Sequence, residues 1–365
     1  MTAILHKNEE QAISALRALY SKYGYLPFKM SKFEEYELYI RNKDFLVSDR
    51  IITFNDTNGK LLALKPDVTL SIIKQGEDSP GVKQKVYYNE NVYRVSESTN
   101  HYKEIMQSGL ECIGDIDLYD IFEVLSLAAH SLELISDSYV LEISHMGIVS
   151  AILDDLGVDQ SLRRQVIGYI SEKNAHDLIR LCGEQDICEE AASRLASLIT
   201  VYGNRADVIS KLEGICTSPA ASQALDQLKM LSKLLDTADT DGRIIFDFSV
   251  VNDMNYYNGI VFKGFIDGIC DGVLAGGQYD KMMHRMGRRA GAIGFALYLD
   301  LLEQLRAPSR GFDVDVLVLY DSATPLSLLC AKVNELVTEG KRVSAQRAIP
   351  EALRYRECLD MRQEA

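Results

Sequence analysis

The sequence from Val92 to Gly114 reads VYRVSESTNHYKEIMQSGLECIG and consists of two strand-like segments joined by a polar loop. In the second segment Gln107, Gly109 and Glu111 occupy every other position and therefore share one face of a strand. An amide, a glycine and a carboxylate on one strand face do not suit a hydrophobic core. The pattern predicts a strand that presents a polar site on one side.

The segments on either side predict a large sheet with flanking helices. Asn58-Gly59, between two apolar runs, is the strongest short signal for a hairpin. Alternating or apolar runs predict further strands over 85–95, 103–113, 243–250, 256–266 and 272–280. Helical spacing of apolar residues predicts helices over 9–22 and 118–135, and residues 291–305 open with small residues and continue as an apolar helix.

Two regions differ from this pattern. The sequence of roughly residues 150–240 predicts a helical insert and contains no convincing strand. After a linker at 306–311, residues 312–365 contain a strand, a helix and one further strand, which predicts a small α/β domain. The fold class is therefore α+β, with an antiparallel sheet domain over 1–305 that the insert interrupts.

Composition restricts the class of protein. The 365 residues carry a formal net charge of −14, which disfavours a nucleic-acid partner because phosphate backbones bind clusters of Lys and Arg. No apolar run is long enough to span a bilayer, and the first residues lack the apolar core of a secretion signal. The seven cysteines are scattered, mostly among apolar neighbours, which predicts reduced core thiols in a cytoplasmic protein.

Polar residues cluster in two further places on the predicted strands. LKPDVT places Asp67 and Thr69 on one face, and the segments NYYNG and LAGGQYD bring tyrosines against glycines, which let a ligand approach the backbone. These clusters could hold a small molecule together with the face of the opening stretch. The carboxylates of Asp67 and Glu111 suit an amine, Gln107 and the tyrosine hydroxyls suit a ring or amide, and Arg94 suits a carboxylate.

Each cluster also has a purely structural interpretation. Arg94 and Glu111 could pair across strands, Gly276-Gly277 could form a bulge, and the tyrosines could be half-buried strand residues. Three clusters in one sheet favour a ligand site. No metal or cofactor is predicted, because the six histidines lack ligand spacing and no phosphate-binding glycine loop or nucleophile elbow occurs. The basic run HRMGRRAG at 284–291 could contact an anion or form a solvated turn.

Five segments in order resemble the class II catalytic domain of histidyl-tRNA synthetase over roughly residues 10–305: DRIITFNDTNGKLLALKPDVT, YKEIMQSGLECIG, FSVVNDMNYYNGIVF, LAGGQYD and AIGFALYLDLL. The resemblance implies a six- or seven-stranded antiparallel sheet, a homodimer and a histidine pocket. It places the histidine contacts on Asp67, Thr69, Arg94, Gln107, Glu111, Tyr257 and Tyr279. Asp67 stands where the synthetases have Glu.

The positions that the resemblance assigns to ATP depart from the family pattern. Where the synthetases carry arginines, this sequence has Asn252, Gln278 and Leu301, and the loop pattern Gly-Arg-x-Arg-Glu reads Asn-His-Tyr-Lys-Glu at 100–104. Removing one strong electrostatic donor typically costs roughly two to three orders of magnitude in rate. The resemblance therefore implies an amino-acid pocket without an ATP clamp. Ser31 replaces a proline of the first family motif, at the family's dimer interface.

This profile matches a paralogous family, the regulatory subunits of ATP phosphoribosyltransferase. The leading hypothesis is a subunit with no catalysis of its own. It would activate the short catalytic subunit in a hetero-oligomer and mediate feedback inhibition by L-histidine in the first step of histidine biosynthesis. The alternatives are a histidyl-tRNA synthetase that charges tRNA and a free-standing histidine sensor.

Overall fold

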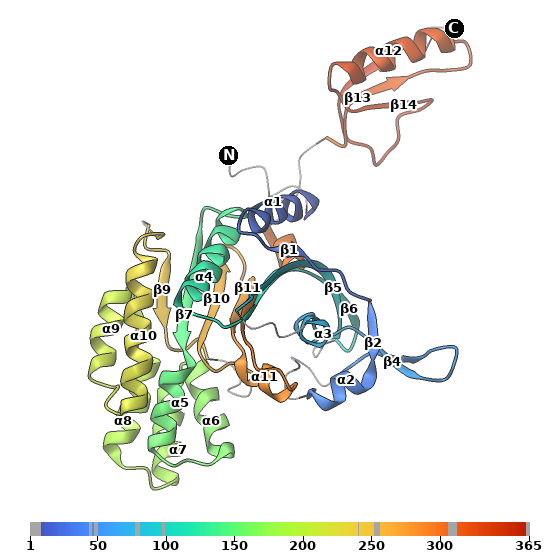
Figure 1. Ribbon diagram of the computed structural model, residues 1–365. Helices are drawn as coiled ribbons and strands as arrows, with labels where there is room; N and C mark the ends of the chain where they lie inside the picture. The colour runs from blue at the N-terminus through green and yellow to red at the C-terminus, as the bar shows by residue number, and fades with distance from the viewer. Residues whose placement is uncertain are drawn as a thin grey trace. The chain divides into compact units, whose positions relative to one another are not determined.

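The computed structural model describes residues 9–43, 46, 50–76, 81–96, 99–239, 241–251, 256–305 and 312–362. The chain divides into two compact units, Met1–Leu305 and Arg306–Ala365. The first unit contains a nine-stranded sheet with helices on both faces (Figure 1). The α+β class expected from the sequence is confirmed.

The nine-stranded sheet has the order β1-β5-β6-β12-β11-β10-β7-β9-β8. Its strands are β1 (Leu26–Pro27), β5 (Gln84–Val95), β6 (Tyr102–Gly114), β7 (Tyr139–His145), β8 (Tyr202–Gly203), β9 (Ile244–Asp247), β10 (Ile260–Ile266), β11 (Leu274–Gln278) and β12 (Gly291–Tyr298). The strands from β5 to β7 pair antiparallel, as the resemblance implied. The sheet is wider than six or seven strands because β1 and β9 add parallel pairings at its two sides and β8 joins β9.

Two parts of the sheet differ from the sequence-based prediction. Strand β7 was not predicted, although it lies between β10 and β9. It is a short apolar run between helices, and periodicity alone does not separate such a run from a buried helix. The segment 291–305 is not mainly a helix: residues 291–298 form β12, and only Leu299–Leu305 coil, as a 3₁₀ helix. The small residues at 291–296 fit close strand pairing with β6 and β11.

The two faces of the sheet carry separate hydrophobic cores. Alternate residues of one strand point to opposite faces, so on β6 Leu110 and Cys112 join the large core while Ile113 joins the smaller one. The large core lies under α1 (Glu9–Lys22) and α4 (Leu118–Glu133), which is N-capped by Asp117. On the other, concave side, β5 and β6 curve around α3 (Thr69–Gln75), as Figure 1 shows. This concave face is the side of Gln107 and Glu111.

A small antiparallel sheet and two short helices complete the concave side. The sheet has the order β2-β4-β3, and its elements with the helices are β2 (Phe33–Glu35), α2 (Tyr36–Arg41), β3 (Thr53–Asn55), β4 (Leu61–Leu64) and α11 (Asp280–Arg285). The hairpin predicted around Asn58-Gly59 is confirmed, and Gly59 has a φ of 80° that favours glycine at this turn. It belongs to this small sheet and not to the large one.

The predicted insert is helical, with one exception. Its helices are α5 (Met146–Asp155), α6 (Gln160–Ser171), α7 (Ala175–Glu184), α8 (Glu189–Ile199), α9 (Arg205–Glu213) and α10 (Pro219–Leu235). Polar N-caps begin several of them, since the side chains of Asp159, Asn174 and Ser218 accept bonds from backbone N–H groups. The exception is β8, whose two residues pair with β9 at the edge of the large sheet.

The second unit is a three-stranded parallel sheet with one helix. The strand order is β14-β13-β15, and the elements are β13 (Val314–Leu319), α12 (Leu326–Thr338), β14 (Val343–Gln346) and β15 (Tyr355–Asp360). The sequence predicted β13, α12 and β14, whereas β15 was missed. Most of β15 is exposed, so it lacks the apolar run by which the other strands were found.

All seven cysteines are free thiols, but only Cys112, Cys182 and Cys216 are buried. The expectation of core thiols is wrong for Cys188, Cys270, Cys330 and Cys358, which are exposed. Within the described ranges, none of the helices is both long enough and apolar enough to cross a membrane.

Candidate functional site

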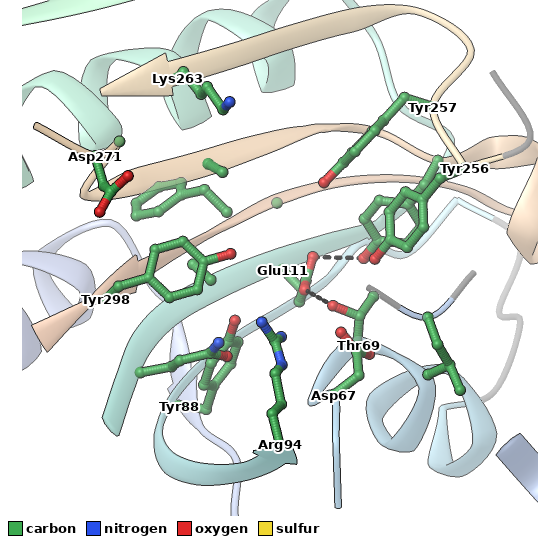
Figure 2. Close-up of a pocket in the computed structure, with 18 residues that line it drawn as sticks. Asp67, Thr69, Tyr88, Arg94, Glu111, Tyr256, Tyr257, Lys263, Asp271 and Tyr298 are labelled. Atoms are coloured by element: carbon green, nitrogen blue, oxygen red, sulfur yellow. Dashed lines mark hydrogen bonds between the residues drawn. The ribbon is translucent and has the colours of Figure 1, made fainter. Parts of the chain in front are cut away.

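A cavity of about 580 Å³ lies on the concave face of the large sheet. All seven residues that the sequence proposed for a ligand site line it: Asp67, Thr69, Arg94, Gln107, Glu111, Tyr257 and Tyr279. They come from the α3 segment, from β5 and β6, and from one end of the antiparallel β10–β11 pair, where Tyr257 precedes β10 and Tyr279 follows β11. The residues are far apart in sequence, and the sheet brings them to one place (Figure 2).

The floor of the cavity is made of residues with little or no side chain. Gly294 on β12 lies beside Glu111, and a Cβ at Gly294 would lie 1.7 Å from Glu111 Oε2. A Cβ at Gly277 would lie 2.6 Å from the ring of Tyr257, and one at Gly109 2.5 Å from the hydroxyl of Tyr88. Real Cβ atoms do not approach other atoms this closely, so these positions require glycine. Gly277, one of the glycines that the sequence paired with tyrosines, thus makes room for the ring of Tyr257.

Glu111 lies at the centre of the inner end of the cavity and is 2% exposed. Its Oε1 accepts a hydrogen bond from Thr69 Oγ1 at 2.8 Å, and its Oε2 accepts one from the hydroxyl of Tyr279 at 2.5 Å. Burial raises the pKa of Glu111 to about 8, and the nearby Asp67 carboxyl adds to the rise, while the two hydroxyl donors oppose it. The group is therefore poised to ionise when a cation or another donor enters.

Asp67 and Thr69 do not lie on a strand, so the strand predicted for LKPDVT is wrong at this point. The chain leaves β4 at Leu64, and Asp67 accepts a bond from the N–H of Leu70 at 3.0 Å in the turn before α3. Thr69 is the first residue of that helix. The turn still presents both side chains to the cavity, because the helix lies inside the curve of β5 and β6.

Three contacts tie this turn to β5. Lys65, whose side chain is fully buried, forms an ion pair with Glu90 at 2.9 Å. The N–H of Tyr93 donates to the Lys65 carbonyl at 2.8 Å, and Arg94 Nε donates to the Pro66 carbonyl at 3.1 Å. A buried lysine is unfavourable without a partner, so the pair with Glu90 is needed to keep the turn in place.

Aromatic rings form the remaining walls. Tyr256 lies with its ring centroid 4.4 Å from that of Tyr257 and 6.1 Å from that of Tyr279. Burial raises the pKa of each of these three hydroxyls well above the ordinary value, so they stay protonated and can donate hydrogen bonds. Asp67 also lies in this buried region, and burial raises its pKa, while the Leu70 N–H and Arg94 oppose the rise. The inner end can therefore hold a small cation together with a polar ring.

The cavity has further lining residues that were not predicted from the sequence, among them Tyr88, Tyr256, Lys263, Asp271 and Tyr298. Tyr88 could have been found, because it is six positions before Arg94 on β5 and so shares its face. Tyr298 shares a face with Gly294 on β12 in the same way. Lys263 and Asp271 gave no such signal, because they come from β10 and from the turn that follows it.

The positions matched to the synthetase arginines supply no cation to the cavity where the structure describes them. The Gln278 side chain turns to β10, where its Oε1 accepts a bond from the N–H of Ile260 at 2.8 Å. Leu301 packs against the large hydrophobic core. Among the described residues that line the cavity, the basic ones are Arg94 and Lys263. Asn252 lies outside the described residues.

Other candidates from the sequence have structural roles or form no site. In the basic run at 284–291, Arg288 donates to the carbonyl of Ile73 at 2.7 Å, near the C-terminal end of α3. The described residues contain no group of three or more His, Cys, Asp or Glu side chains that could hold a metal ion.

Comparisons with known proteins agree with this architecture. A model of a family described as histidyl-tRNA synthetase matches residues 5–302. A protein of Bacillus cereus named ATP phosphoribosyltransferase regulatory subunit is 27% identical over 324 residues, which cover 86% of this chain and 76% of that protein.

Two solved structures share the fold. A Bacillus halodurans protein described as an ATP phosphoribosyltransferase regulatory subunit/histidyl-tRNA synthetase superposes with a TM-score of 0.81 at 22% identity, over 97% of this chain and 94% of the other. A chain of an ATP phosphoribosyltransferase complex from Thermotoga maritima superposes with a TM-score of 0.64 at 20% identity, over 80% of this chain and 97% of the other.

Proposed function

The chain belongs to the histidyl-tRNA synthetase family, and we propose that within it the chain is a regulatory subunit of ATP phosphoribosyltransferase. In this role it binds a separate short catalytic subunit, raises its turnover and conveys feedback inhibition by L-histidine in the first step of histidine biosynthesis. It performs no catalysis itself. Chemistry on the substrates of that step belongs to the partner.

The contrast within one cavity carries this proposal. The side chains that suit an amino acid all line the cavity. At two positions where the synthetases have arginines, the Gln278 side chain bonds to β10 and Leu301 packs against the large hydrophobic core. Activating an amino acid with ATP requires cations on the transferring phosphoryl group. A site that has the side chains for binding an amino acid, but not the arginines for ATP, suits a sensor better than a ligase. The name of the Bacillus cereus relative supports the same role.

L-Histidine is the ligand that we assign to the cavity. Its ammonium group and its ring N–H are donors, which suit the carboxyls of Asp67 and Glu111. Its carboxylate suits Arg94, whose Nε is already fixed on the Pro66 carbonyl. Gln107, which is 3% exposed, and the hydroxyls of Tyr257 and Tyr279 supply the remaining polar partners.

Assembly and location belong to the same proposal. The chain forms a hetero-oligomer with the catalytic subunit and a homodimer through its first unit, in the cytoplasm. The Thermotoga maritima structure is described as a complex of ATP phosphoribosyltransferase, which supports the hetero-oligomer. The homodimer rests on the family resemblance alone.

A mixing experiment tests the function. The purified chain is added to a short-form ATP phosphoribosyltransferase, and complex formation and turnover are measured while histidine is titrated in. We expect a stable complex, higher turnover and inhibition by histidine. Absence of any association would leave the free-standing sensor.

A second assay separates the regulatory subunit from a synthetase. The chain alone is tested for histidine-dependent exchange between ATP and pyrophosphate. We expect no exchange above background, since the described cavity offers no arginine besides Arg94. Clear exchange would reject the regulatory role and support the alternative, a histidyl-tRNA synthetase.

A further inference from the structure

The cavity is larger than a free amino acid requires. Its volume of about 580 Å³ lies within the range of roughly 300–1,000 Å³ that is typical of sites for drug-sized ligands. The inner end holds Asp67, Thr69 and Glu111. Figure 2 shows Lys263 and Asp271 at the opposite end, with Tyr298 between them and Arg94. The histidine site of the proposed function accounts for the inner end only.

The outer end carries one charge of each sign. Lys263, on β10, and Asp271, in the turn that leads to β11, are both exposed at the rim of the cavity. The chain next to Asp271 approaches Lys263, because a Cβ on Gly272 would lie 3.6 Å from Lys263 Cδ. A ligand that reaches this end therefore meets both a cation and a hydrogen-bond acceptor.

The floor between the two ends leaves room for the backbone of an extended ligand. Ala275 and Ala296 are register partners on neighbouring strands, as are Gly277 and Gly294, so no long side chain rises from this part of β11 and β12. Tyr298 forms the wall above it. Burial raises the pKa of the Tyr298 hydroxyl, and the Arg94 guanidinium beside it opposes the rise. Tyr298 and Arg94 together mark the boundary between the inner and outer ends.

The direction of the bound amino acid sets what can fill the outer end. With its amine and ring at Asp67 and Glu111 and its carboxyl group at Arg94, the carboxyl carbon is the atom nearest to the outer end. An extension from that carbon that offers an N–H donor and a terminal anion would match Asp271 and Lys263. A peptide unit followed by a C-terminal carboxylate provides both groups.

We propose that the cavity also accepts short peptides with an N-terminal histidine, held at Asp67 and Glu111 by their first residue and at Asp271 and Lys263 by their second. This inference rests on the proposed histidine site. The amide N–H of the peptide donates to the Asp271 carboxylate, and its C-terminal carboxylate pairs with the Lys263 ammonium group. Binding is non-covalent, and no bond of the ligand is broken.

The test is calorimetry on the full chain with L-histidine, L-histidylglycine and glycyl-L-histidine. We expect L-histidylglycine to bind one site per chain at least as tightly as histidine and to compete with it. Glycyl-L-histidine should not bind, because its amine is one residue away from the ring. In the double variant Lys263→Met/Asp271→Asn the affinity for L-histidylglycine should fall about tenfold, since two charged hydrogen bonds are lost, while the affinity for histidine stays within about twofold.

The double variant Lys211→Met/Asp207→Asn is the matched control. It changes an exposed lysine and an exposed aspartate on α9, in the helical insert, and should leave both affinities unchanged. Histidine binding without L-histidylglycine binding would overturn the inference and leave the proposed function intact. An equal loss of both ligands in the cavity variant would also overturn it. If neither histidine nor L-histidylglycine binds, the histidine site itself is rejected, and the inference with it.

Discussion

The hydroxyl of Tyr279 donates a hydrogen bond to Glu111 Oε2 over 2.5 Å, although 168 positions separate the two residues. Tyr279 follows β11, Glu111 lies on β6, and β12 runs between these strands. The contact is possible because Gly294, opposite Glu111 on β12, has no side chain to block it. One buried carboxyl on β6 thus connects the end of β11 with the start of α3.

Replacing the Glu111 carboxyl should weaken histidine binding and leave the fold intact. We expect Glu111→Gln and Glu111→Ala to weaken binding at least about tenfold in calorimetry, since a hydrogen bond to a charged group contributes about 1.5–3 kcal/mol. Glu104→Gln is the control, because Glu104 lies on the same strand but is exposed. Undiminished binding by the Glu111 variants would place the inhibitory site elsewhere.

Histidine binding should release protons near neutral pH. The pKa of Glu111 is about 8 in the empty cavity, so below pH 8 the carboxyl is mostly protonated and must ionise to receive an ammonium group. The affinity should rise from pH 6.5 to 8, and calorimetry in buffers of different ionisation enthalpy should detect the released proton. Glu111→Gln should remove this proton release. A release of equal size in that variant would assign it to another group.

The raised pKa of Glu111 also affects the stability of the protein without ligand. The folded-state pKa of Glu111 lies above the ordinary value of 4.5, so folding favours the protonated form. The stabilisation is complete below about pH 4.5 and is lost as the pH rises through 8. Denaturant unfolding of the wild-type chain and of Glu111→Gln should therefore show a difference that grows in favour of the variant between pH 5 and 8. A difference independent of pH would contradict the raised pKa.

The Tyr279 hydroxyl should stabilise the fold by a small amount. Tyr279→Phe removes one buried hydrogen bond and leaves Glu111 with one donor, so we expect a loss of about 1 kcal/mol in denaturant unfolding. The pKa of Glu111 should also rise further, because this donor opposes the effect of burial. Tyr102→Phe is the control, since Tyr102 is 76% exposed and its hydroxyl should contribute almost nothing. Equal stability of the two variants would show that the bond is not formed.

Gly294→Ala should disrupt the site although it adds only one methyl group. The new Cβ would lie 1.7 Å from Glu111 Oε2 and 2.4 Å from the Leu110 carbonyl oxygen, so the backbone must shift. We expect loss of histidine binding and about 1–3 kcal/mol of destabilisation. Gly183→Ala is the control: Gly183 lies in α7 with open space around it, and alanine there should be neutral or stabilising. Normal binding by Gly294→Ala would contradict the position of the carboxyl.

The sequence predicted which residues line the cavity more accurately than the secondary structure of the segments that carry them. The alternation of Gln107, Gly109 and Glu111 is a local pattern, and β6 has this alternation. Asp67 and Thr69 were placed in the site for the wrong local reason, as strand residues, whereas they lie at the start of a helix. Their polarity beside a hairpin was informative even though their secondary structure was misjudged.

The sequence by itself determined the strand pair β5–β6, its polar face and the residue types of the inner end of the cavity, because alternation along a strand is set by the residues themselves. Only the tertiary structure decided that β7 enters the sheet, that Gly294 lies under Glu111, and that Lys263 and Asp271 join the cavity. These outcomes depend on which strands pair and in which register, and that choice is made between segments far apart in the chain.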